Sequence, residues 1–232
     1  MGMAGKTLLS WSSGKDSAWA LHILRGVSDV EVVGLMTTVN QVHQRVSIHA
    51  VRLELLQRQA KAVGLPLQVI DLPSPCTNSQ YEAAMEIFVG ESKRRGIDCF
   101  AFGDLFLADI KEYREAKLAG TGITPLFPLW QTPTDRLAKE MISSGLRAVV
   151  TCVDPQHLPV SFAGREFNEQ FLADLPGTVD PCGERGEFHT FAYDGPMFEE
   201  PVRIGRGPVV ERDGFGYADL LPALEHEASL SN

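Results

Sequence analysis

Short apolar runs alternate with segments of helical periodicity along the first two thirds of the chain. The predicted strands cover residues 8–10, 30–37, 67–72, 99–103, 124–129 and 147–153. The run at residues 30–37 is almost continuous, which is typical of a strand buried on both faces, and residues 99–103 are expected to form another buried strand. The segments between the predicted strands predict helices over residues 18–25, 47–63, 79–95, 108–119 and 132–144. A capping box at residues 79–82 and the pair Thr132 and Pro133 are expected to begin two of these helices.

Strands that alternate with helices through short links predict an α/β fold. The sheet should be mainly parallel and Rossmann-like, with helices on both faces and right-handed crossovers. From Asp154 onward proline and glycine become frequent, and only residues 165–175 keep a helical pattern. We therefore expect an α/β domain at residues 1–128 and a smaller domain at residues 129–232.

Small and hydroxyl-bearing residues follow the first predicted strand. Residues 12–17 read Ser-Ser-Gly-Lys-Asp-Ser and lead into a helix, whose N-terminal N–H groups favour an anion. Lys15 supplies a charge for phosphate, and Asp16 suits a hard cation such as Mg²⁺ that accompanies phosphates. The spacing does not fit a Walker A loop. The residues predicted to bind phosphate are Ser12, Ser13, Gly14, Lys15, Asp16 and Ser17, with Asp16 as the metal ligand; the alternative is an ordinary Ser/Gly-rich turn.

Residues at the ends of other strands belong to the same expected pocket, because ligands bind at the carboxyl ends of parallel strands. Thr37 and the pair Gly103 and Asp104 are predicted to contact the nucleotide, although Asp104 could instead cap the next helix. Arg114 could neutralise a leaving pyrophosphate, and the alternative is a solvated basic helix face shared with Lys117. Residues 128–131, which include Trp130, indicate core packing when taken alone.

A second unusual stretch lies at residues 181–190, where two glycines, two carboxylates, a thiol and a histidine are close together. Glu184 and Glu187 could orient an amine nucleophile or accept its proton. Cys182 fits a packed thiol better than a nucleophile, because no base is evident beside it. The alternative for the whole stretch is a glycine-rich hairpin with solvated acids.

Composition narrows the classes of function. The net charge of −9 disfavours nucleic acid as the main partner. No apolar run is long enough to span a membrane, and residues 1–6 lead directly into a strand, so we expect no signal peptide and a cytoplasmic location. Four widely separated cysteines agree with a reducing compartment, and the six histidines show no spacing typical of a zinc site.

Two distant motifs resemble one family. Residues 12–17 are similar to the pyrophosphate-binding (PP) loop of the N-type ATP pyrophosphatases, the group with GMP synthetase and argininosuccinate synthetase. Residues 183–191, with Asp194, Pro196 and Phe198, resemble the Gly-Glu signature of the diphthine–ammonia ligase family. His49, Tyr113 with Arg114, and residues 128–131 and 140–142 also match that family.

The resemblance implies a HUP-type nucleotide-binding domain and an ATP-dependent ligase that forms an amide. In eukaryotes and archaea, family members adenylate the carboxylate of diphthine on elongation factor two, and ammonia then displaces AMP. ATP and Mg²⁺ are the implied cofactors, and ammonia or a small amine and an acceptor are the implied partners. The resemblance assigns catalysis to Lys15, Asp16, Arg114, Glu184 and Glu187. It assigns substrate binding to His49, Tyr113, Trp130, Gly183, Glu184, Glu187 and His189.

Departures from the family pattern concern the acceptor. Ser13 replaces a glycine of the loop, and His189 replaces the last glutamate of the Gly-Glu signature. Residues 151–167 also differ from the sequence expected of a diphthine enzyme, and we expect them to form part of the acceptor pocket. The acceptor can therefore differ from diphthine. For some bacterial relatives with this wording, a role in cobalamin salvage has been suggested. Two other classes stay open: a sensor that binds ATP or AMP without turnover, and a sulfur- or nitrogen-transferring enzyme acting on a nucleoside, which the net charge disfavours. A homodimer is an open alternative to a monomer.

Overall fold

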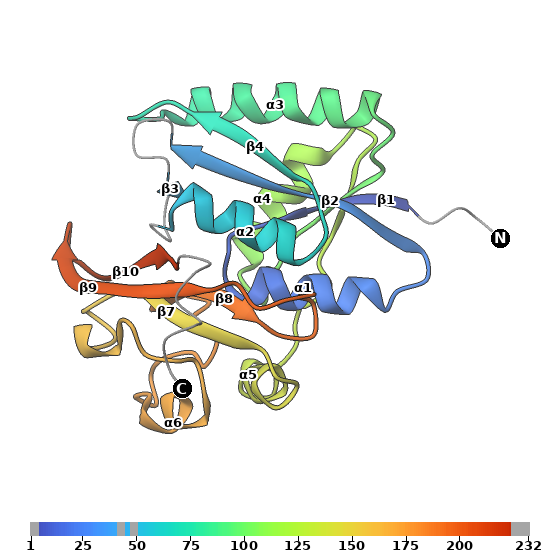
Figure 1. Ribbon diagram of the computed structural model, residues 1–232. Helices are drawn as coiled ribbons and strands as arrows, with labels where there is room; N and C mark the ends of the chain where they lie inside the picture. Colours follow the sequence, from blue (N-terminus) through green and yellow to red (C-terminus); the bar gives the residue numbers. More distant parts are fainter. Residues whose placement is uncertain (1–4, 41–44, 47–50, 224–232) are drawn as a thin grey trace.

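The computed structural model describes residues 5–40, 45–46 and 51–223 and contains two sheets separated by helices (Figure 1). The first sheet has parallel strands β1 (Gly5–Ser10), β2 (Val30–Asn40), β4 (Leu67–Leu72), β5 (Cys99–Ala101) and β6 (Thr124–Leu126). Their spatial order is β4-β2-β1-β5-β6, and the short strand β3 (Arg45–Val46) pairs antiparallel with β2. The predicted Rossmann-like sheet is confirmed.

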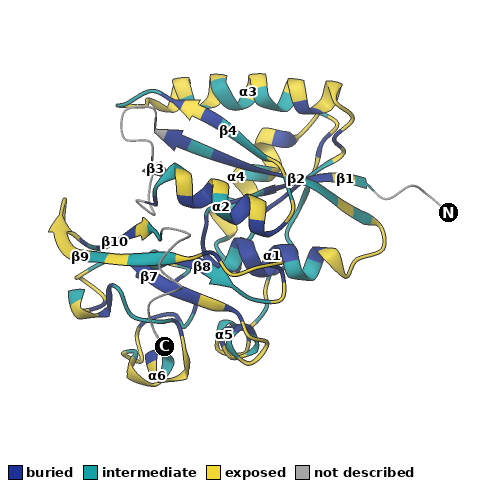
Figure 2. Ribbon diagram, viewed as in Figure 1, coloured by how far each residue is buried: buried dark blue, intermediate teal, exposed yellow. Residues whose placement is uncertain are grey.

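Helices cover both faces of this sheet. Helices α1 (Lys15–Arg25) and α2 (Leu53–Ala62) lie between the two sheets, whereas α3 (Asn78–Arg94) and α4 (Ala108–Leu118) cover the opposite face (Figure 1). Most residues of helix α1 are buried, but within α3 the only buried residue is Ser92 (Figure 2). Helix α1 therefore sits in the centre of the molecule, and α3 forms an outer surface.

The second sheet is antiparallel and forms the smaller C-terminal part. It contains β7 (Arg147–Val153), β8 (Phe188–Asp194), β9 (Ile204–Arg212) and β10 (Phe215–Pro222) in the order β8-β7-β10-β9. Helices α5 (Thr134–Ser143) and α6 (Glu169–Asp174) and the 3-10 helix η1 (Val160–Phe162) pack around it. The sequence predicted a smaller C-terminal part but missed three of these strands, and in β9 and β10 glycines and charged residues obscure the alternation.

One apolar core joins both sheets. Trp11 after β1 and Phe188 and Phe191 of β8 belong to the same buried cluster. Side-chain hydrogen bonds tie the two parts further, since Arg25 donates to the carbonyls of Met197 (2.8 Å) and Val63 (2.5 Å). The predicted boundary at residues 128–129 lies in the sequence between β6 and β7, and the division into two domains stays a prediction.

Two expected helix starts are wrong. The capping box of α3 is formed by Thr77 and Gln80, because the Thr77 hydroxyl accepts from the Gln80 N–H and the Gln80 side chain accepts from the Thr77 N–H. Helix α5 begins one residue after Pro133, and Thr132 does not cap it. Residues 47–50 of the second predicted helix lie outside the described residues, and α2 itself starts at Leu53. None of the helices in the described part of the chain is long and apolar enough to cross a membrane.

Candidate functional site

The strand order places a crevice between β1 and β5. From β1 the chain continues to β2 on one side, whereas β5 and β6 lie on the other side, and ligands bind at such a switch point in open parallel sheets. A cavity of about 230 Å³ opens there. Its walls come from the loop after β1, the loop after β5 and the segment that leads into β8, so the two distant sequence motifs meet in one cavity.

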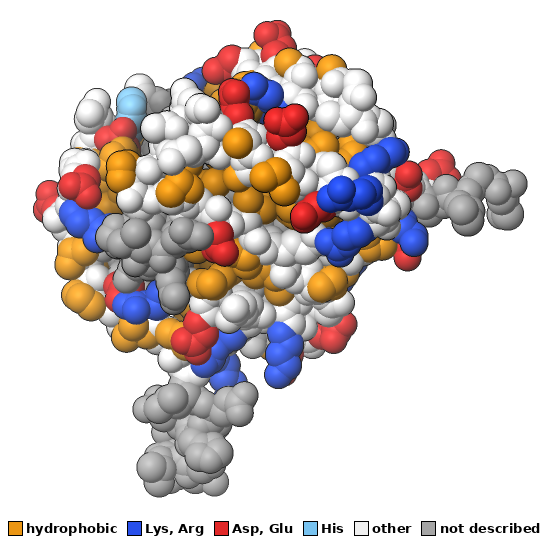
Figure 3. Space-filling model, turned by 90° about the horizontal axis from the view of Figure 1, so that it is seen from above, with side chains coloured by type: hydrophobic (Ala, Val, Ile, Leu, Met, Phe, Trp, Pro, Cys, Tyr) orange, Lys and Arg blue, Asp and Glu red, His pale blue; other side chains and the backbone are white. Residues whose placement is uncertain are grey.

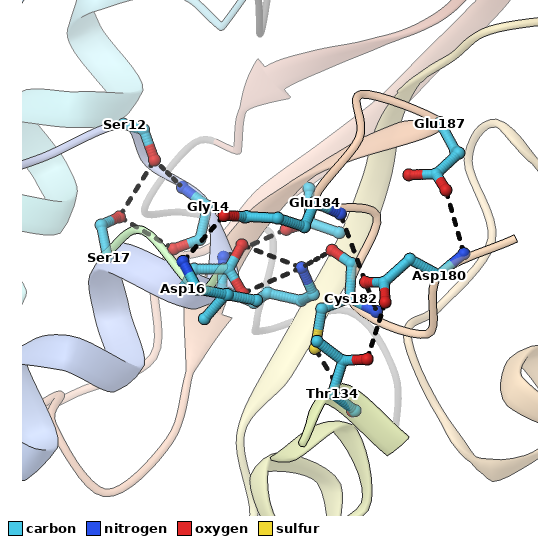
Figure 4. Close-up of polar contacts among 12 residues, drawn as sticks. Ser12, Gly14, Asp16, Ser17, Thr134, Asp180, Cys182, Glu184 and Glu187 are labelled. Atoms are coloured by element: carbon cyan, nitrogen blue, oxygen red, sulfur yellow. Dashed lines mark hydrogen bonds and ion pairs between the residues drawn. The ribbon is translucent and has the colours of Figure 1, made fainter. Parts of the chain in front are cut away.

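The loop after β1 turns its hydroxyl groups toward this cavity (Figure 4). The Ser12 and Ser17 Oγ atoms lie 3.2 Å apart, and the Ser12 Oγ accepts from the Gly14 N–H at 3.3 Å. The Ser17 hydroxyl also donates to the Gly14 carbonyl at 3.0 Å. These contacts shape the N-terminus of α1 into a set of small donors, which is the arrangement expected of an anion site.

Ser13 has a structural position in the same loop. Its backbone φ of 74° lies in the left-handed region, and its buried hydroxyl makes no hydrogen bond within the described chain. Its carbonyl accepts from the Ala192 N–H (2.9 Å) and from the Gln59 side chain (3.0 Å), which fastens the loop to β8. The Ser13 side chain is not among the described residues that line the cavity.

Lys15 lines the cavity while its side chain is only 2% exposed. The ammonium donates to both Asp16 carboxylate oxygens (3.1 and 2.9 Å) and to the Cys182 carbonyl. Burial acts to lower the pKa of Lys15, but the acidic groups around it, Asp16 first among them, together outweigh burial and hold that pKa above its ordinary value. Burial raises the pKa of Asp16. Lys15 is therefore a fixed cation at the bottom of the cavity.

Asp16 and its neighbours have donors suited to Mg²⁺. The Asp16 carboxylate is 26% exposed, and the Ser12 and Ser17 hydroxyls line the same cavity. No group of three or more acidic, histidine or cysteine side chains in the described chain could hold a metal alone. This donor set fits Mg²⁺, which usually binds through one or two carboxylates together with substrate phosphates.

The loop after β5 contributes a carboxylate and a cation. The Arg114 guanidinium on α4 donates to both oxygens of Asp104, from Nε at 2.6 Å and from Nη2 at 3.1 Å. Asp104 is therefore no helix cap, and the N-cap of α4 is Leu107. A Cβ atom on Gly103 would lie 3.1 Å from backbone atoms of Asp16 and Ser17, so this glycine allows α1 and β5 to approach closely.

The two glutamates of the second motif point in different directions (Figure 4). Glu184 lines the cavity, and its Oε1 accepts from the Leu105 N–H at 2.7 Å. Burial raises the pKa of Glu184 to about 7. Glu187 is 2% exposed, and its oxygens accept from the backbone N–H groups of Asp180 and Arg185, each at 3.0 Å. Of the two, Glu184 can reach a ligand, whereas Glu187 holds its own loop.

The rest of this motif forms the far wall of the cavity. Gly183 has φ of 69°, and a Cβ there would lie 2.7 Å from the Phe188 carbonyl, so only glycine fits. Burial and the Lys15 charge lower the pKa of His189 to about 4, which leaves a neutral imidazole beside the cavity. Burial raises the pKa of the Cys182 thiol, and its Sγ lies 3.5 Å from the Thr134 carbonyl, as expected of a packed thiol.

Other predicted site residues lie elsewhere. Thr37 is buried in β2, and the Trp130 ring centroid lies 5.4 Å from the Nζ of Lys111. Thr37 and Trp130 are not among the described residues that line this cavity. Tyr113 lines a neighbouring cavity. Lys117 pairs with Glu82 of α3 at 2.8 Å. His49 lies outside the described residues.

Sequence reasoning missed the residues that hold the second motif in place. The Asp180 carboxylate accepts from the Cys182 N–H (2.9 Å) and from the Thr134 hydroxyl (2.6 Å). The Thr190 hydroxyl accepts from the Lys15 N–H at 3.0 Å and so joins the two motifs directly. A carboxylate just before a glycine-rich turn was the available signal for Asp180.

The fold and this cavity define an α/β protein with a cavity suited to an anion at the end of its first strand. The family models for the diphthamide synthase N-terminal and C-terminal domains match residues 5–122 and 133–220. The chain belongs to the diphthamide synthase family and is an ATP-dependent ligase that forms a carbon–nitrogen bond.

Similar curated proteins agree with this placement. The human protein named diphthine–ammonia ligase is 28% identical over 92% of this chain and 89% of its own length. The cattle protein of that name is 27% identical over 90% of this chain and 86% of its own. The zebrafish protein of that name is 30% identical over 162 residues, 62% of this chain and 63% of its own.

Proposed function

We propose that the enzyme adenylates a carboxylate of an acceptor and then transfers the acyl group to ammonia or a small amine. The observation that supports this proposal best is the meeting of an anion-binding loop with an acid of raised pKa in one cavity. The first feature suits pyrophosphate, and the second suits an amine nucleophile.

The first step is attack of the acceptor oxygen on the α-phosphorus of ATP. The bond to the bridging oxygen breaks, and pyrophosphate leaves with the electron pair. Lys15 and the N–H groups at the start of α1 stabilise the charge that develops on this leaving group. Arg114 faces the cavity from the opposite side, and there a guanidinium can hold the reacting carboxylate or the α-phosphate.

Asp16, with Ser12 and Ser17, would hold the Mg²⁺ that accompanies the triphosphate. A bound Mg²⁺ would supply neutralisation of phosphate charge. In the second step the amine attacks the acyl carbon, AMP leaves, and Glu184 accepts a proton from the amine. A carboxyl group with a pKa of about 7 is suited to this transfer near neutral pH.

The acceptor in this chain stays open. The relatives are named for diphthine and ammonia, so a carboxylate acceptor and ammonia are the first candidates. His189, a neutral imidazole, lines the cavity. We propose that its lack of charge helps to select the acceptor.

Exchange of labelled pyrophosphate into ATP tests the first step, with a panel of carboxylate acceptors present. Adenylation predicts AMP and pyrophosphate as products and an acceptor-dependent exchange. Lys15→Met should lower the exchange rate at least a hundredfold, and Lys6→Ala, a change at an exposed lysine of β1, should leave it unchanged. A melting curve of Lys15→Met checks that it folds, and Glu184→Gln serves as a second variant that should keep the exchange but slow amide formation. Formation of ADP would contradict the proposal.

A further inference from the structure

A second cavity of about 310 Å³ lies between α3 and α4, over β5. Its floor is formed by Phe100, Phe102 and Leu118, which belong to a buried apolar cluster of the parallel sheet. Figure 3 shows the α3 side of the molecule, where apolar side chains gather between acidic and basic ones. The volume and the largely apolar lining are typical of sites for small organic groups.

Helix α3 leaves this cavity open. Tyr81, Met85 and Val89 are spaced four residues apart and therefore share one helix face, which lines the cavity. All three are only partly buried, and Ile87 on another face is 64% exposed. The apolar face of α3 is thus incompletely covered by the described chain.

Arg114 forms part of the border between the two cavities. It lines the second cavity and the cavity at the loop after β1, and its guanidinium stacks 4.2 Å from the centroid of the Phe102 ring. The neighbours of Phe102 along the chain, Gly103 and Asp104, line the first cavity. A ligand in the second cavity could therefore place one end beside the reacting phosphate.

At this border Arg114 can bind a carboxylate. Two acidic side chains of α3, Glu82 and Glu86, also line the cavity, so like-charge repulsion would keep a ligand carboxylate at Arg114 and away from α3. Arg114 already binds the Asp104 carboxylate with two hydrogen bonds, and a ligand carboxylate could replace one of them in the same geometry. The other cation in the cavity, Lys117, pairs with Glu82 and lies farther along α4. The aromatic and aliphatic walls suit an uncharged, apolar group rather than a second charge.

We propose that the cavity between α3 and α4 binds the acceptor as a carboxylic acid with an apolar body. The body lies between Met85, Val89 and Phe100, and the carboxylate lies on Arg114. This inference rests on the proposed function and names the acceptor's chemical class. The carboxylate oxygen forms the bond to the α-phosphorus, pyrophosphate leaves, and the resulting acyl–AMP carries its apolar group in this cavity until the amine displaces AMP.

Binding can be tested without turnover, so failure here is distinct from failure of adenylation. The probe is 3-phenylpropanoate, with 3-phenylpropanamide as its uncharged control, added to the full chain carrying ¹³C-methyl methionine. The Met85 methyl signal, assigned with Met85→Leu, should shift with the acid, and at least tenfold more weakly with the amide. Arg114→Gln should remove this preference for the acid.

Met85→Trp should fill the cavity, and Ile87→Trp is its matched control on an exposed position of the same helix. By calorimetry, Met85→Trp should weaken probe binding at least tenfold and leave ATP binding within twofold, whereas Ile87→Trp should change neither. Tyr81→Ala removes part of a wall instead of filling the cavity, and it should also weaken probe binding severalfold. It serves as the test variant if Met85→Trp does not fold.

A peptide that ends in phenylalanine distinguishes the source of the acid. Binding of both the free acid and the peptide supports a small molecule or a chain end, and binding of the peptide alone supports an acceptor carried on protein. A Met85 signal that neither the free acid nor the peptide moves would overturn the proposal. Loss of ATP binding in Met85→Trp would also overturn it, because the cavity would then hold the nucleotide.

Discussion

Replacing Ser13 by glycine should stabilise this enzyme. An L-residue in the left-handed region costs about 1–2 kcal/mol, and a buried hydroxyl without a partner costs about 1–3 kcal/mol. Ser13 has both features, with φ of 74° and a buried Oγ that finds no hydrogen-bond partner among the described residues. Glycine removes both costs but adds about 0.4–1 kcal/mol of conformational entropy in the unfolded chain. The lost contacts of the side chain lower the gain further.

The net expectation is a gain of about 2 kcal/mol in the free energy of unfolding, or roughly 4–8 °C in Tm for a chain of this size. Urea unfolding and a thermal melt followed by circular dichroism measure both. Ser13→Ala is the matched control, because it removes the hydroxyl and keeps the left-handed strain. It should give a smaller gain than Ser13→Gly.

ATP binding provides a second readout of the same change. The Ser13 side chain is not among the described residues that line the cavity, so both variants should bind ATP within about twofold of the unchanged chain. An unchanged or lower Tm in Ser13→Gly would refute the strain argument. A tenfold loss of ATP affinity in both variants would show instead that the hydroxyl contacts the nucleotide.

Three further changes test the site. The rate of amide formation with methoxyamine, a weakly basic nucleophile, should rise as pH passes through about 7, and Glu184→Gln should lose this rise in rate. Because the pKa of Glu184 is raised in the folded chain, the free energy of unfolding should fall between pH 4.5 and about 7, and Glu184→Gln should lack this fall. Gly103→Ala should lower the free energy of unfolding by about 1–3 kcal/mol and weaken ATP binding, because its Cβ meets the first turn of α1. Gly90→Ala, with open space around its Cβ, should lower neither, and equal stability of the two variants would contradict this reasoning. Glu187→Gln should lower the free energy of unfolding, measured by urea unfolding, by about 1–3 kcal/mol, since an amide NH₂ would face a backbone N–H. If the variant is as stable as the unchanged chain and only kcat is reduced, Glu187 is catalytic instead.

The alternation of apolar runs and helical segments was enough to predict the parallel sheet. Residues 34–37 of β2 and residues 100–101 of β5 are all buried, so both faces of these strands are covered and their sequences contain apolar runs. The antiparallel sheet was harder to predict because β9 has exposed positions through most of its length and carries two glycines and a proline, which conceal its period.

The sequence by itself determined the α/β class, the loop after the first strand and the presence of a second glycine-rich acidic motif. These features depend on local composition and on residues adjacent in the chain. Only the tertiary structure decided that Glu184 faces the cavity while Glu187 supports its loop, and that Arg114 pairs with Asp104. Side-chain direction at these positions depends on which backbone N–H groups and charges lie nearby after folding, and those partners come from segments far apart in the sequence.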